Sequence, residues 1–201
     1  MDYSEPRPAG RPRDADADDR IIDAALAEYA AHGRAGYSLN GVARRAGVGK
    51  SSIYLRWPDK ESLLVDAVHL RSEVPDVDTG SLRGDLHALV DWLLGCYLTE
   101  AGWVVVRITV DSAADGESTT SPQVVGAHHA EAVNDLWRRA AARGEIGPED
   151  DRAVHEVTRM MFGDLIMRAM VDRERMLGLS AEARSAEAAY VVDLLLRLLG
   201  R

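Results

Sequence analysis

The chain has 201 residues, and its 24 Lys and Arg against 33 Asp and Glu give a formal net charge of −9. This length predicts one or two domains with a sizeable core. The single cysteine, Cys96, excludes an internal disulfide and a zinc site built from several cysteines, and is typical of a reducing cytoplasm. The sequence shows neither the apolar core of a signal peptide nor the roughly 18 apolar residues of a membrane span. We therefore expect a cytoplasmic protein without a membrane segment, whose acidity disfavours indiscriminate nucleic-acid binding.

Helical signals follow one another along the whole chain. Residues 1–14 hold arginines among prolines, a composition typical of a flexible arm. Helices are then predicted over 14–33, 39–46, 50–57 and from 60, and, beyond a connector at 74–80, over 82–94, 103–110, 122–143, 148–171 and 180–200. Ser38 and Asp59 are placed to cap two of them, and Gly33 is expected to end the first. Residues 103–110 have strand-like composition, but no second such segment exists to pair with them, so the prediction is an all-α fold.

The charge is distributed unevenly. Residues 29–58 contain five cations and no Asp or Glu, whereas the chain beyond residue 57 has a net charge of −10. Such asymmetry favours contact with nucleic acid through the first part of the chain, although a short window of this kind also arises by chance.

The same window contains the spacing of a helix-turn-helix. A small residue, Ala43, precedes a glycine, Gly47, which can take the positive φ that a tight turn between helices requires. Ile53 then supplies an apolar anchor on the second helix. An ordinary helical hairpin with a glycine turn is the alternative interpretation of the spacing alone.

Residues 19–70 go further and resemble the TetR family of bacterial transcription regulators. The similarity lies in the glycine that closes the first helix, in Ser38, in V-A-x-x-A-G-V, and in I-Y-x-x-W-P-D-K-E-x-L-L. The resemblance implies a three-helix DNA-binding domain at 15–62, behind a basic arm at 1–14. It also implies a helical effector-binding and dimerisation domain at 63–201.

The family resemblance assigns DNA contacts to particular positions. Phosphate contacts are implied for Ser38, Tyr54 and Lys60, and contacts to the backbone or the groove for Arg44, Arg45 and Arg56. Lys50, Ser51 and Ser52 open the recognition helix, whose amino-terminal side chains face the major groove. Three of these residues have a structural alternative. The Tyr54 ring is expected to pack inward as well, Arg45 is also explained as a solvated side chain, and Lys60 as a surface lysine.

Two glycines depart from the family pattern. Gly49 replaces a capping serine or threonine, which costs a few tenths of a kcal/mol. Gly41 stands where a larger or acidic residue is usual, and weakens the second helix by about 1 kcal/mol relative to alanine.

In the arm, residues 10–13 are either a minor-groove ligand or a tail that adds only nonspecific attraction.

The second half of the chain suits a dimer with a small-molecule pocket. The helices at 148–171 and 180–200 have apolar surfaces wider than one stripe, which predicts a symmetric four-helix interface between two copies; coverage within one chain is the alternative. Six aromatic and methionine residues are predicted to line an effector pocket, although each is also explained as core: Trp92, Tyr97, Trp103, Trp137, Met161 and Phe162. Acidic residues at 91, 100, 111 and 164 would favour a cationic effector if they point inward.

These features predict a repressor that a small molecule releases from a palindromic DNA operator. Activation instead of repression is compatible with the same residues, because the sign depends on operator placement. The alternative class is a helical small-molecule-binding protein whose DNA-binding half is vestigial. No nucleophile and base are paired, the adjacent His128 and His129 diverge on a helix, and we expect no enzyme, no metal and no cofactor.

Overall fold

The computed structural model describes residues 15–115 and 127–201. The predicted basic arm and much of the polar loop after residue 115 lie outside these ranges. Within them every element is helical, which confirms the all-α prediction. Residues 103–110 fall inside a helix, as the absence of a pairing partner predicted.

The helix bounds agree with the sequence prediction in most places. The helices are α1 (Ala15–Gly36), α2 (Leu39–Ala46), α3 (Lys50–Tyr54), α4 (Lys60–Arg71), α5 (Leu82–Cys96), α6 (Glu100–Asp115), α8 (Ala127–Ala142), the 3₁₀ turn η1 (Pro148–Asp150), α9 (Asp151–Val171), α10 (Arg173–Leu177) and α11 (Ala181–Leu198). Two helix ends were predicted wrongly and one helix was missed. Helix α3 ends at Tyr54 instead of Trp57, because the chain turns there toward Pro58, and α1 does not end at Gly33 but bends there and continues to Gly36. Helix α10 was not expected.

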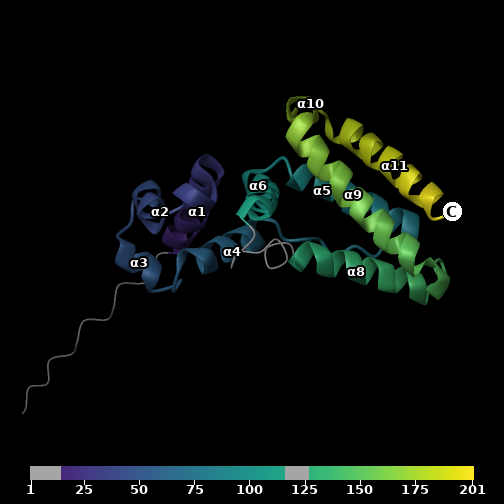
Figure 1. The fold of residues 1–201 in the computed structure, drawn as a ribbon, viewed down its shortest axis with the longest axis horizontal. Coiled ribbons are helices and arrows are strands. Elements are labelled where there is room, and N and C mark those ends of the chain that lie inside the picture. Colours follow the sequence, from purple (N-terminus) through teal and green to yellow (C-terminus); the bar gives the residue numbers. More distant parts are fainter. Residues whose placement is uncertain (1–14, 116–126) are drawn as a thin grey trace, which may run out of the picture.

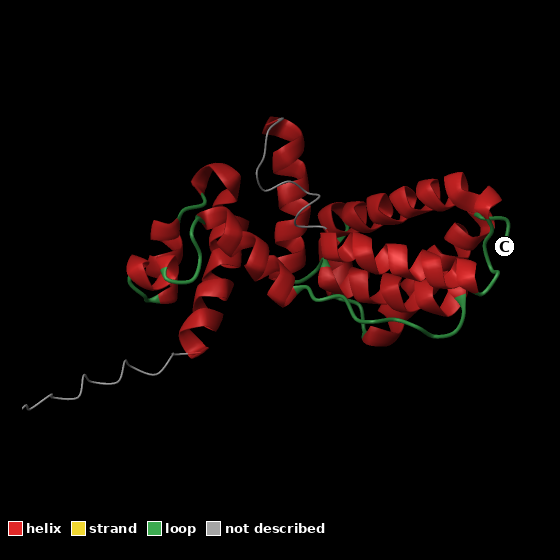
Figure 2. Cartoon of the chain, turned by 90° about the horizontal axis from the view of Figure 1, so that it is seen from below, coloured by secondary structure: helices red, strands yellow, loops and turns green. Residues whose placement is uncertain are grey.

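The described helices form an elongated molecule with α6 between its two halves (Figures 1 and 2). Helices α1 to α4 make one end, and α3 lies at the extremity opposite the carboxyl terminus (Figure 1). Helices α5, α8, α9, α10 and α11 make the other end, where α11 packs along α5 and α9. Helix α6 packs against α1 and α4 of the first half and directly follows α5 of the second half in the chain, so it joins the two halves.

The apolar stripes of these helices meet in one continuous core. In the first half Ile21, Val42 and Ile53 are fully buried, and in the second half Leu93 is fully buried and Leu165 nearly so. Within the described ranges no single helix is long and apolar enough to cross a membrane. The sharply bent pair formed by residues 82–96 and 100–112 passes that test by length and composition only.

A buried carboxylate holds the connector between the two halves. Asp85, in the first turn of α5, has no exposed surface. Its Oδ1 accepts hydrogen bonds from the Thr79 amide at 2.6 Å and the Thr79 hydroxyl at 2.7 Å, and its Oδ2 lies 2.7 Å from Arg143 Nη2. Burial alone would raise the pKa of Asp85, but these hydrogen bonds and the Arg143 charge outweigh burial and lower the pKa.

We predict that Asp85→Asn lowers the free energy of unfolding at pH 7 by about 2 kcal/mol, because an amide cannot accept all these hydrogen bonds. A carboxylate with a depressed pKa stabilises the folded state above its unfolded pKa, and that stabilisation is lost as the pH falls through the folded value. Denaturant unfolding should therefore show the variant and wild type converging below about pH 4. Asp76→Asn, at a 95% exposed side chain, is the control and should change little. A constant difference at all pH values would contradict the assignment.

Candidate nucleic-acid interface

The turn between α2 and α3 has the geometry that the sequence spacing predicted. Ser38 caps α2, its Oγ accepting a hydrogen bond from the Gly41 amide at 3.2 Å. Gly47 ends α2 in the left-handed region, with φ 69° and ψ 32°. A residue with a Cβ is strained there, so the glycine sets the angle between the two helices. Ala43 and Ile53 are buried on either side of the turn.

The amino-terminal residues of α3 point away from the core. Lys50 and Ser51 are exposed, Ser52 is half-buried, and Gly49 precedes the helix without a side-chain cap. Tyr54 is 55% exposed, so the expectation that its ring packs inward was wrong. The reason is that Ile53 occupies the buried position of this short helix, which leaves Tyr54 on its outer side.

A shallow groove of about 340 Å³ is lined by all three predicted phosphate contacts, and its wall also includes Asp59 and Glu61. Ser38, Lys50, Tyr54 and Lys60 all line it, so the chain brings together side chains from α2, α3 and α4. The amino termini of α2 and α4 open at the same place, with their partial positive charge. Lys60 Nζ donates to the Tyr37 carbonyl at 3.3 Å and lies 3.9 Å from Glu61 Oε1.

The Asp59 carboxylate at the rim of this groove belongs to the helix cap. It accepts a hydrogen bond from the Ser62 amide at 2.7 Å, and the Ser62 hydroxyl donates back to the Asp59 carbonyl at 3.0 Å. The Ser62 amide hydrogen bond lowers the pKa of Asp59. The carboxylate is thereby engaged in starting α4.

Two of the arginines predicted to contact DNA are paired with α1 instead of standing free. Arg45 Nη2 lies 3.3 Å from Glu28 Oε2. Arg56 pairs with Asp18 and donates to the Ser52 carbonyl at 2.9 Å. Arg44, by contrast, is exposed on α2. Sequence reasoning missed both carboxylates, although Glu28 is the last acidic residue before the acid-free window.

Glu28 also explains why position 41 is a glycine. Its side chain is only 4% exposed and lies directly against α2. A Cβ at Gly41 would overlap Glu28 Oε1. The family's larger residue at this position is therefore incompatible with a carboxylate below α2.

The second half contains a cavity of about 180 Å³ between α5, α6, α8 and α9. Tyr97 and Phe162, both predicted to line a pocket, are part of its wall, together with Val105, Val106, Thr109, His129, Ala130 and Ile166. The other predicted lining residues lie elsewhere. Trp92 packs edge-on against His129 at 5.4 Å, Trp103 lies below the Arg173 guanidinium, Trp137 donates to Thr158 beside a different cavity, and Met161 is core.

The acidic residues considered for a cationic effector do not line this cavity. Asp91 pairs with Arg184, Asp111 faces α1, and Asp164 pairs with Arg168. Glu100 is exposed at the start of α6. Among the residues that the structure describes, no three His, Cys, Asp or Glu side chains are grouped to hold a metal ion.

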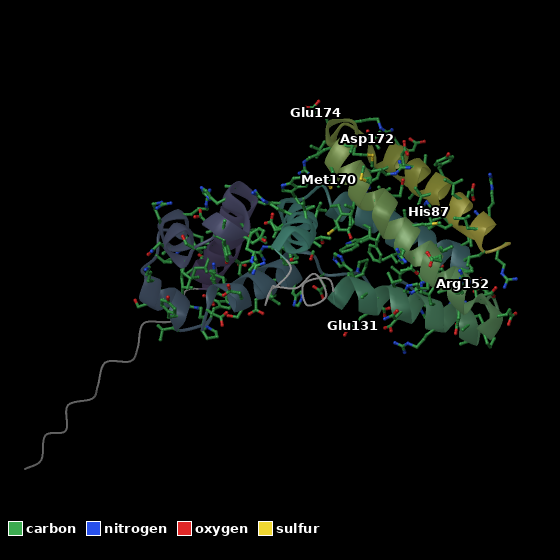
Figure 3. The ribbon with its side chains drawn as sticks, in the orientation of Figure 1. His87, Glu131, Arg152, Met170, Asp172 and Glu174 are labelled. Atoms are coloured by element: carbon green, nitrogen blue, oxygen red, sulfur yellow. The ribbon has the colours of Figure 1, made fainter. Side chains whose placement is uncertain are left out.

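An apolar face remains exposed on α9 and α11. It is formed by Met160, Met167, Met170, Tyr190, Leu194 and Leu198, each at least 40% exposed. Met170 lies near the end of α9 that leads into α10 (Figure 3). On α9 the buried residues Val157, Met161 and Leu165 occupy the opposite side, so the two-sided apolar pattern predicted for this helix is present.

Comparison with known families agrees with this architecture. Residues 21–67 match the family model described as bacterial regulatory proteins, tetR family. Residues 76–196 match the model described as tetracyclin repressor-like, C-terminal domain. The protein is thus a helix-turn-helix regulator with a helical carboxyl-terminal domain, and the chain belongs to the TetR family.

Individual relatives show how far the similarity extends. The HTH-type transcriptional regulator AqdR of Rhodococcus erythropolis is 33% identical over 135 residues, which span 66% of this chain and 65% of that relative. The fatty acid degradation regulator FadR of Bacillus halodurans shares the fold with a TM-score of 0.66 at 20% identity, over 89% of this chain and 97% of that one. FadR of Bacillus subtilis, solved with stearoyl-CoA, has a TM-score of 0.66 at 18% identity, over 88% of this chain and 96% of its own.

We predict that Gly41→Ala destabilises the protein by about 2 kcal/mol, although alanine is ordinarily the better helix residue, because the new Cβ overlaps the Glu28 carboxylate. Adding Glu28→Ala should recover part of that loss in thermal unfolding. Gly95→Ala is the matched control, because its Cβ would meet only the Arg184 guanidinium at 3.6 Å. If Gly41→Ala proved neutral, the close packing of Glu28 on α2 would be refuted.

Proposed function

We propose that this protein is a dimeric DNA-binding repressor that a small-molecule effector releases from a palindromic operator. The carrying observation is the groove where the amino termini of α2 and α4 meet Lys50, Tyr54 and Lys60, with the Asp59 carboxylate at its rim engaged in the cap of α4 and Glu61 beside Lys60. Two helix termini and two cations directed at one place are suited to a phosphate group. The proposed domains are those expected from the sequence, 15–62 for DNA and 63–201 for effector and dimer.

In this proposal the side chains divide into two kinds. Ser38, Tyr54 and Lys60 bind phosphates and so fix the register of α3 on the duplex. Lys50, Ser51 and Ser52 enter the major groove at the amino-terminal end of α3, with Arg44 beside them on α2. Arg45 and Arg56 contribute mainly by holding α2 and α3 to α1, since each is paired with a carboxylate of that helix.

The test is selection of bound sequences from random duplexes, followed by variants at the groove. We predict that Lys50→Ala and Tyr54→Ala each weaken binding of the selected duplex at least about tenfold, and that Lys50→Ala reduces the slope of log affinity against log salt by about one. Both side chains are exposed, so thermal unfolding should be unchanged. The control Arg138→Ala removes an exposed cation of α8 and should leave affinity intact.

The vestigial alternative makes the opposite prediction. If no duplex is enriched in the selection, or if Lys50→Ala and Tyr54→Ala bind as tightly as wild type, the DNA-binding half is not used in this way. The protein would then be a helical small-molecule-binding protein.

The exposed face of α9 and α11 supports dimerisation. Methionine, leucine and tyrosine side chains lie in rows on two adjacent long helices, and two such pairs of helices brought face to face form a four-helix interface. A dimer would also present two copies of α3 to the two halves of a palindrome.

We predict that Met167→Glu combined with Tyr190→Glu converts the dimer into a monomer, because carboxylates would be buried without partners at the centre of the interface. Light scattering at micromolar concentration gives the mass directly. Leu70→Glu, at an exposed apolar side chain of α4, is the control and should remain dimeric. A wild-type monomer, or a double variant that still dimerises, would contradict this interface.

The effector site of the proposal is the cavity lined by Tyr97, Phe162 and His129. Its volume of about 180 Å³ is below the range of about 300–1,000 Å³ common for drug-sized ligands, and its wall is mostly apolar. These properties favour a small apolar effector with one polar group placed toward His129. The structure of FadR of Bacillus subtilis contains stearoyl-CoA, which is far larger than this cavity.

A further inference from the structure

Helix α1 is interrupted by a bend at Gly33, whose backbone angles are not helical. Gly33 has φ 60° and ψ −171°, a combination that is essentially restricted to glycine. The helix resumes after it, with the Tyr37 amide donating to the Gly33 carbonyl at 2.9 Å. Ser38 then caps α2 at once, so the direction taken at Gly33 sets where α2 and α3 begin.

The bend separates two groups that would bond to each other in a regular helix. The Arg34 amide would donate to the Ala30 carbonyl, four residues earlier. It donates instead to Asp111 Oδ2 of α6 at 3.1 Å. The Ala30 carbonyl accepts a hydrogen bond from the Arg107 guanidinium, also of α6. The ion pair of α6, in which Arg107 Nε lies 4.0 Å from Asp111 Oδ2, thus supplies the donor and the acceptor that replace this helical hydrogen bond.

Further contacts fit this pair to the bend. Tyr29 donates its hydroxyl to Asp111 Oδ2 at 3.1 Å. Arg107 lies over Gly33 so closely that a Cβ there would be 2.6 Å from Nη2. Both α6 side chains are mostly buried, at 31% and 25% exposed, which strengthens their hydrogen bonds relative to a surface pair.

Helix α6 also contributes to the wall of the 180 Å³ cavity described above. Val105, Val106 and Thr109 line that cavity, while Arg107 and Asp111 face α1. A movement of α6 that accommodates an occupant would therefore displace the groups that hold α1 bent.

We propose that Arg107 and Asp111 form a clasp, the α6 clasp, that keeps α1 bent at Gly33 and so positions α2 and α3 for DNA. When the clasp is withdrawn, the Arg34 amide bonds to the Ala30 carbonyl, α1 straightens, and α2 moves with it. Arg107 and Asp111 are positioning residues, and their effect on DNA rests on the proposed function. Glycine at 33 is essential to this device because it permits both the bent and the straight form.

The test is whether Gly33→Ala lowers or raises the midpoint of thermal unfolding in two different backgrounds. In wild type, Gly33→Ala should lower the midpoint of thermal unfolding, since alanine is strained in the bent form and collides with Arg107. In the Arg107→Met/Asp111→Leu background, where α1 is free to straighten, the same substitution should raise the midpoint because alanine favours a continuous helix. A lowered midpoint in both backgrounds would overturn the proposal, since the glycine would then be required regardless of the clasp.

Binding of the selected duplex provides the second measurement. Arg107→Met/Asp111→Leu should weaken it about tenfold or more, within the range of ordinary allosteric couplings. Asp111→Asn keeps an acceptor for the Arg34 amide and should retain most of the affinity. The control Asp91→Leu/Arg184→Met removes a different interhelical ion pair and should change neither the affinity nor the sign of the Gly33→Ala effect.

The two proposals fail in different ways. If wild type binds no duplex, the proposed function is wrong, while the sign reversal in thermal unfolding still reports on the clasp. If wild type binds but the clasp double variant binds equally well, the clasp does not set DNA affinity.

Discussion

The position of α1 is the constraint on which the rest of the molecule depends. Near its start Asp18 holds Arg56, which follows α3, and in its middle Glu28 lies against α2 and pairs with Arg45. At its bend the backbone is completed by side chains of α6. One helix therefore carries the elements proposed to face DNA on one side and is held by α6 on the other. In such an arrangement a movement of α6 would change the position of α1, and with it the positions of α2 and α3.

The same contacts resolve the conflict between an acidic chain and an anionic partner. Two carboxylates of α1 lie close to the surface proposed to face DNA, but both are engaged: Glu28 is buried against α2, and Asp18 is paired with the Arg56 guanidinium. Asp59 is likewise occupied by the cap of α4. Lys50 and Arg44 remain exposed on the outer side, where they are available to an anionic partner.

Much of this architecture was predictable because it depends on local signals. Ser38, Gly47 and Asp59 act on groups a few residues away, and each has the capping or turning geometry expected of it. Gly33 shows the limit: a glycine after an apolar stripe predicts a helix end, but side chains 74 and more residues away convert that end into a bend. The contact between Glu28 and Gly41 likewise depends on packing between distant segments. So does the wall of the cavity, which contains His129 and none of the three tryptophans predicted to line it.

The acceptor of the Arg34 amide hydrogen bond, identified by NMR scalar coupling across that bond in the free protein and on a selected duplex, tests the central claim most directly. Coupling between sites is reciprocal, so if the clasped form is the one that binds DNA, DNA must in turn favour the clasp. We predict that the duplex strengthens the coupling of the Arg34 amide to the Asp111 carboxylate and weakens any coupling to the Ala30 carbonyl. Unchanged couplings in the free and bound protein, with the Ala30 carbonyl as a populated acceptor in both, would show that the bend in α1 and DNA binding are independent.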